Sequence, residues 1–105
     1  MADRKTLQLC NQVFETLSMV MSGEFDDDIL LNLEVTAVEP MGSASQMLVS
    51  LRMLSPMPEV PLAEIMDKLQ AVESDMRMEI AAAINRKKTP KLHFRVLPST
   101  DGLSD

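Results

Sequence analysis

Residues 69–94, LQAVESDMRMEIAAAINRKKTPKLHF, contain the changes of pattern that decide the fold. Up to Ile84 the apolar residues recur at spacings of three and four, which is typical of an amphipathic helix. Thr89-Pro90 ends this pattern, because the residue before a proline is pushed toward extended geometry. From Leu92 onward apolar and polar residues alternate, which predicts a strand. The stretch therefore predicts a helical segment, a basic loop and a strand, in that order.

The helical pattern starts earlier, after Pro61, and is too long for one straight helix in a small domain. About 27 residues would form a rod of roughly 40 Å, whereas a 100-residue domain has a radius of gyration of about 13 Å. We therefore expect a break at Glu73-Ser74-Asp75, with Ser74 as the N-cap of a second helix.

Three more elements precede this segment. A stripe of apolar residues predicts a helix over residues 4–22, ended by Gly23; the stripe is Leu7, Cys10, Phe14, Leu17 and Met21. An alternating pattern over residues 29–37 predicts a strand with Ile29, Leu31, Leu33, Val35 and Ala37 on one side. A turn at residues 40–43 joins it to a second predicted strand at residues 47–53.

Length and composition indicate one soluble domain. The 105 residues suffice for a single core, and the uncharged apolar runs are far shorter than the ~20 residues that span a bilayer. The first 20 residues lack the pattern of a secretory signal, so we expect a cytoplasmic protein. One cysteine and one histidine exclude an intrachain disulfide and a Cys/His zinc site. Residues 99–105 are expected to form a flexible tail after a domain at residues 1–98.

Charge is distributed unevenly along the chain. Residues 80–100 hold five bases and no acid, whereas the rest of the chain carries a net charge of −11. Such a cluster also fits a helix C-terminus, where cations are favoured by the helix dipole. The overall charge of −6 argues against a protein that coats nucleic acid with its whole surface, but it leaves one local anion-binding patch.

Two segments resemble the bacterial ribosome-binding factor A family. These are Val35-Thr36-Ala37-Val38-Glu39 and the helix, break, helix and basic loop of residues 69–94. The resemblance implies an α+β, KH-like fold of the second topological type, with the order α-β-β-α-(break)-α-β and helices on one face of a three-stranded sheet. It also implies a cytoplasmic factor that binds the small ribosomal subunit and its rRNA and assists subunit assembly and rRNA maturation. We expect no cofactor, no DNA or membrane partner, and a monomer.

The resemblance also assigns candidate RNA-binding residues. The phosphate candidates are Arg86, Lys87, Lys88, Lys91 and Arg95, with Arg77, Arg4 and Lys5 as weaker additions. The helix break falls at Val72-Glu73-Ser74, where the family has Ala-x-Gly. Here the glycine is missing and Glu73 adds a negative charge, so a protein-interaction module with little RNA binding is the alternative.

Catalytic chemistry has little support in the sequence. Cys10 lies on an apolar helix stripe, which predicts a buried, inert thiol. His93 has no recognisable catalytic partner nearby, and residues 26–28 lack the spaced ligands of a calcium loop. We therefore expect a binding protein and not an enzyme.

Overall fold

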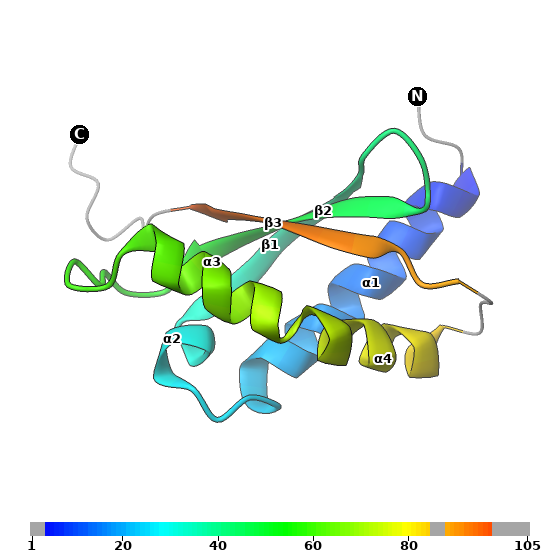
Figure 1. The fold of residues 1–105 in the computed structure, drawn as a ribbon. Helices are drawn as coiled ribbons and strands as arrows, with labels where there is room; N and C mark the ends of the chain where they lie inside the picture. The colour runs from blue at the N-terminus through cyan, green and yellow to red at the C-terminus, as the bar shows by residue number, and fades with distance from the viewer. Residues whose placement is uncertain (1–3, 85–87, 98–105) are drawn as a thin grey trace.

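The computed structural model describes residues 4–84 and 88–97. Its helices lie together on one face of a three-stranded sheet (Figure 1), as expected for the predicted α+β class. Within the described part of the chain, no helix is long and apolar enough to cross a membrane. The elements are α1 (Arg4–Gly23), α2 (Asp28–Leu31), β1 (Leu33–Pro40), β2 (Gln46–Met53), α3 (Leu62–Ala71), α4 (Glu73–Ala83) and β3 (Lys91–Leu97).

The strand order β1-β2-β3 places the basic start of β3 beside the hairpin that joins β1 to β2. The pair β1 and β2 is antiparallel, whereas β2 and β3 run parallel, with Lys91 opposite Gln46. The backbone N–H of Lys91 donates to the carbonyl oxygen of Ser45 in the hairpin at 2.9 Å. Because β1 and β3 are the outer strands, each has one edge that the sheet leaves unpaired.

A β-bulge changes which side chains of β1 face the helices. The register shifts between Val35 and Ala37, so that Ala37 lies opposite Ser50 and Val38 opposite the buried Val49. The prediction that Ala37 continues the inner row of this strand is therefore wrong. A bulge inserts one extra residue on one strand, and every side chain after it changes face.

The short helix α2 replaces the predicted start of the first strand. The carboxylate of Asp27 accepts hydrogen bonds from the backbone N–H groups of Ile29 (2.8 Å) and Leu30 (3.3 Å), which caps the helix. Lys68 of α3 donates to the other oxygen of Asp27 at 2.7 Å. This hydrogen bond from Lys68 is the main reason that the pKa of Asp27 lies below its usual value. Residues 29 and 31 thus belong to a helix, contrary to the prediction.

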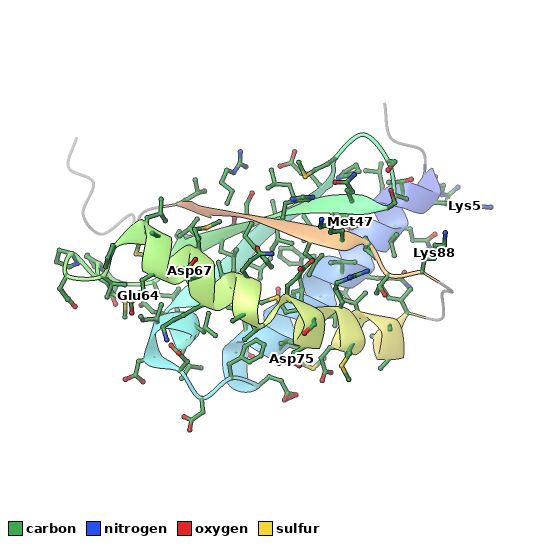
Figure 2. All side chains as sticks on the ribbon, in the orientation of Figure 1. Lys5, Met47, Glu64, Asp67, Asp75 and Lys88 are labelled. Carbon is green, nitrogen blue, oxygen red and sulfur yellow. The ribbon has the colours of Figure 1, made fainter. Side chains whose placement is uncertain are left out.

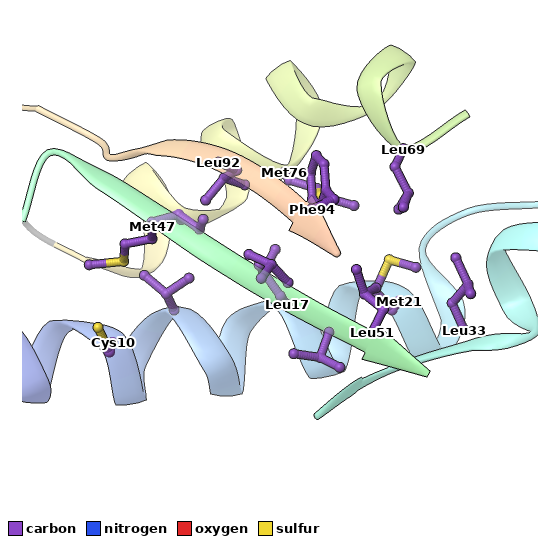
Figure 3. Close-up of a cluster of buried hydrophobic side chains, with 14 of the residues drawn as sticks. Cys10, Leu17, Met21, Leu33, Met47, Leu51, Leu69, Met76, Leu92 and Phe94 are labelled. Carbon is purple, nitrogen blue, oxygen red and sulfur yellow. The ribbon is translucent and has the colours of Figure 1, made fainter. Parts of the chain in front are cut away.

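One apolar core lies between the sheet and the helices (Figure 3). The inner residues of β2 and β3, including Met47, Leu51, Leu92 and Phe94, point toward the helices. Each such side chain contributes about 1.5–3 kcal/mol when fully buried. In α1, Cys10, Leu17 and Met21 of the predicted stripe are buried and Phe14 is partly buried, whereas Leu7 is 52% exposed and Leu9 lies in the core in its place.

Candidate nucleic-acid interface

The helix break consists of a single residue, Val72. Its N–H donates to the carbonyl oxygens of Lys68 (3.3 Å) and Leu69 (3.2 Å), which closes α3. Its own carbonyl oxygen accepts from the N–H of Met76 at 3.0 Å, which is the first hydrogen bond of α4. A break between two helices is therefore confirmed, but its predicted position at Glu73-Ser74-Asp75 and the prediction of Ser74 as N-cap are wrong, because all three residues lie within α4, which begins at Glu73.

This break needs no glycine. Val72 has φ −104° and ψ 6°, a conformation that an L-residue adopts without strain. Among the described residues, no residue other than glycine has a positive φ. The absence of a glycine at Ser74 therefore does not distort the break, because Ser74 lies within α4.

Glu73 directs its charge at the sheet. The residue is half-buried, and its Oε2 atom accepts a hydrogen bond from the backbone N–H of Leu92 at 3.0 Å. Its Oε1 atom lies 3.5 Å from Nε2 of Gln70. Both carboxylate oxygens of Glu73 are thus engaged by donors of the protein, on β3 and on α3.

Lys88 and Lys91 are exposed at the entrance to β3. Neither side chain has an ion-pair partner or a hydrogen-bond acceptor among residues 4–84 and 88–97. Arg86 and Lys87, the other two predicted phosphate ligands of this loop, lie outside the described residues. Within residues 80–100 the structure describes three basic residues, which we call the cationic strip: Lys88, Lys91 and Arg95.

Arg95 differs from the two lysines because it has partners on the sheet. Its Nη2 atom lies 3.7 Å from a carboxylate oxygen of Glu39 and donates to Oγ of Ser50 at 2.9 Å. Both the Arg95 and Glu39 side chains are more than half exposed, so the pair is screened by water. Arg95 therefore offers a polyanion less free charge than Lys91 does.

Arg4 and Lys5 are exposed in the first turn of α1. Figure 2 shows Lys5 and Lys88 at the same end of the molecule, while Glu64 and Asp67 of α3 lie toward the opposite end. Cations in a first turn are disfavoured by the helix dipole, so these two residues do not stabilise α1 through their charge. Their placement adds positive potential to the end that holds the cationic strip.

Arg77 differs from the exposed candidates because its guanidinium is bonded to the backbone. It is half-buried on α4, and its Nη2 atom donates to the carbonyl oxygen of Thr89 at 3.2 Å. Its Nε atom is buried and has no partner within the described structure. The structure therefore places this guanidinium against the backbone of Thr89, next to Lys88.

The open face of the sheet carries a further polar pair that the sequence reasoning did not assign. Nε2 of His93 lies 2.9 Å from Oε1 of Gln46, between the positions of Lys91 and Arg95 on β3. The alternation of β3 already placed these three residues on one face. The partner in β2 could be found only from the parallel register.

Cys10 and His93 do not form a catalytic pair, because they lie on opposite faces of the sheet. Cys10 is 4% exposed in the core, and its burial, followed by the charge of Glu39, raises the pKa of the thiol. The inert thiol expected from the sequence agrees with this environment.

A hollow of about 500 Å³ lies between α1 and β1, away from the cationic strip. Apolar residues such as Phe14, Leu31 and Leu54 line it, together with Glu34. None of the predicted site residues contributes to its lining. This hollow therefore gives no support to a small-molecule site at the helix break, because no residue of the break lines it.

Comparison with known proteins identifies the family. No family model matches the chain. The ribosome-binding factor A of Solibacter usitatus is 31% identical over 94 residues, which cover 90% of this chain and 75% of that protein. The chain belongs to the ribosome-binding factor A family. This confirms the resemblance seen in residues 35–39 and 69–94.

Solved structures of ribosome-binding factor A share the fold. The crystal structure of the Thermus thermophilus protein is 20% identical and gives a TM-score of 0.69, covering 89% of this chain and 94% of that one. A solution structure of a Thermotoga maritima protein, described as a putative ribosome-binding factor A, is 18% identical with a TM-score of 0.58, covering 87% and 81%. These likenesses agree with the KH-like arrangement expected from the sequence.

A third similar structure is a homology model of Thermus thermophilus ribosome-binding factor A fitted into a cryo-EM map of its 30S complex. It is 17% identical with a TM-score of 0.64 and covers 98% of this chain and all of that one. That relative was therefore described on a small ribosomal subunit.

Proposed function

We propose that this chain binds the small ribosomal subunit in the cytoplasm and assists subunit assembly and rRNA maturation. In this proposal the cationic strip and the face formed by α3, Val72 and α4 contact rRNA. Family membership and the description of a Thermus relative on a 30S particle support the choice of partner. The proposed role is binding, with no chemical step and no cofactor.

The observation that carries the proposal is the exposure of Lys88 and Lys91 without partners in the described structure of a strongly anionic chain. The whole sequence has a charge of −6, yet residues 80–100 contain five bases and no acid. Lysines that are free of ion pairs can neutralise phosphates and release bound counterions. Arg86 and Lys87 would extend the same surface, and Arg4 and Lys5 would add to it from α1.

Single-stranded or irregular rRNA is the ligand that this surface fits best. Proteins recognise such RNA by its shape and unstacked segments, and an exposed helix turn beside cations can follow an irregular backbone. At the one-residue break, Val72 is partly buried against the core, and the exposed residues Ser74 and Asp75 follow it in the first turn of α4, next to the bond between Glu73 and Leu92 of β3. The missing glycine is no obstacle, because Val72 adopts an ordinary conformation.

Sedimentation of cell extract through a sucrose gradient tests the proposal. The wild-type chain should travel with free small subunits and not with complete ribosomes. Lys88→Gln with Lys91→Gln removes two charges from the strip and should release the chain to the top of the gradient. Asn11→Asp with Met19→Glu changes the net charge equally at two exposed positions on α1, outside the proposed rRNA-contacting surface, and should leave sedimentation unchanged.

Two outcomes would contradict the proposal. If the wild-type chain stays at the top of the gradient and copurifies with a protein, the alternative of a protein-interaction module is favoured. If both double variants travel with the small subunit as the wild type does, the subunit is bound through another surface.

A further inference from the structure

Two side chains of α4 hold the segment that enters β3. Glu73 and Arg77 are four residues apart, which places them on the same side of a helix one turn from each other. Glu73 accepts from the N–H of Leu92 at 3.0 Å, and Arg77 donates to the carbonyl oxygen of Thr89 at 3.2 Å. One carboxylate and one guanidinium therefore bond to the backbone at both ends of residues 89–92.

The other two residues of this segment are fixed as well. Pro90 is less than 2% exposed, and the N–H of Lys91 donates to Ser45 in the hairpin. Consecutive N–H groups of a strand point to opposite sides, so Lys91 bonds toward the hairpin and Leu92 toward α4. Because β3 is an outer strand, the N–H of Leu92 has no neighbouring strand to bond with on that edge. The carboxylate of Glu73 accepts its hydrogen bond instead.

The surroundings of Arg77 suit a positioning residue better than a phosphate ligand. A ligand of phosphate presents several donors to solvent, as the exposed Lys88 and Lys91 do. Arg77 is half-buried, directs one donor at Thr89, and has a buried Nε atom without a partner in the described structure. Its guanidinium is bonded to the backbone directly after Lys88.

We infer that Glu73 and Arg77 form a clamp on residues 89–92 that sets the positions of Lys88 and Lys91 for phosphate contact. This inference rests on the proposed function for its effect on RNA binding. The clamp joins the helix break to the cationic strip, because Glu73 is the first residue of α4 after Val72. It also gives the negative charge of Glu73 at the helix break a structural role.

The salt dependence of binding separates a positioning residue from a ligand. Each phosphate contact with single-stranded RNA adds about −0.7 to the slope of log K against log salt concentration. Arg77→Met should weaken binding to purified free small subunits about 3- to 10-fold and leave the slope unchanged. A loss of this size corresponds to the cost of ordering one or two long side chains on binding. Lys91→Gln should reduce the steepness of the slope by about 0.7.

Two results with Arg77→Met would overturn the inference. A slope that becomes less steep by about 0.7 would make Arg77 a direct phosphate ligand. Unchanged affinity would show that the loop does not depend on it. Arg77→Lys keeps a donor and a charge, so it should recover part of the affinity if the contact with Thr89 matters.

Amide hydrogen exchange tests the clamp without RNA. Glu73→Ala should accelerate exchange of the Leu92 amide at least about tenfold, because this N–H then faces water at the sheet edge. Asp75→Ala is the matched control, since Asp75 is an exposed acid in the same first turn of α4. Equal exchange rates at Leu92 in the two variants would refute the clamp. If the wild type does not bind RNA, but Glu73→Ala still accelerates exchange of the Leu92 amide and Asp75→Ala does not, only the proposed function is refuted.

Discussion

Replacing Met76 with alanine should lower the free energy of unfolding by about 3 kcal/mol, whereas the same replacement at Met78 should change it by less than about 0.5 kcal/mol. The two residues share one helix and one side chain type. Met76 is 1% exposed and Met78 is 69% exposed, so each is the control for the other. The comparison tests the orientation of α4, on which the direction of Glu73 and Arg77 depends.

The magnitude follows from what each truncation removes. At Met76 the lost groups are buried among the core side chains, at about 0.8 kcal/mol per methylene-sized group, and a cavity remains. Substitutions of buried methionine by alanine cost about 2–5 kcal/mol in total. At Met78 little apolar area is lost, and alanine is a slightly better helix former.

Urea denaturation followed by circular dichroism measures both effects. With an m-value of about 1.5 kcal/mol per M, the midpoint of Met76→Ala should fall by about 2 M, and that of Met78→Ala should move by less than about 0.3 M. Equal shifts for the two variants would mean that α4 is rotated from the described position. Glu73 and Arg77 would then not face β3, and the reasoning about the clamp would be refuted with it.

Three other predictions concern the break, the cap of α2 and the cysteine. Ser74→Gly should lower the melting temperature by about 2–4 °C, because Ser74 lies within α4; a rise would place the break at residue 74. Asp27→Ala should cost about 1 kcal/mol at pH 7, and because the pKa of Asp27 is lowered in the folded state, this difference should hold above about pH 4 and shrink as the pH falls further. A difference that is constant from about pH 7 to about pH 2 in urea titrations would contradict the contact with Lys68. The Cys10 thiol should react with a thiol reagent in native buffer far more slowly than in urea, and equal rates would contradict its burial.

Periodicity predicted the long elements because their burial follows from local patterns. The stripe of α1 and the alternation of β2 and β3 each point one row of side chains at the core, and no distant residue is needed to fix this. The α2 helix is different, since Asp27 caps it while bonded to Lys68, a residue 41 positions away. Such a cap competes with the strand pattern of residues 29–31 and cannot be read from them.

The break and the bulge were harder to place for another reason. Each depends on a single residue. Val72 separates α3 from α4, and the shift after Val35 turns Ala37 to the other face. The apolar spacing through Leu69 and Met76 is continuous, so it contains no signal for the position of the break.

The exposed lysines of the site follow from the sequence, but the partners of its other residues do not. A run of bases before a strand predicts the exposure of Lys88 and Lys91. The pairing of Arg95 with Glu39 requires the order β1-β2-β3, since these residues lie on the two outer strands. The contacts of Arg77 and Glu73 require β3 to lie beside α4.

The slope of log K against log salt concentration, measured with purified free small subunits, tests most directly whether Lys88 and Lys91 contact phosphates. The Lys88→Gln, Lys91→Gln double variant should give a slope less steep than the wild type by about 1.4, which corresponds to two lost contacts. The Asn11→Asp, Met19→Glu variant, changed only at exposed positions on α1, should keep the wild-type slope. Identical slopes for all three proteins would show that these lysines do not bind rRNA.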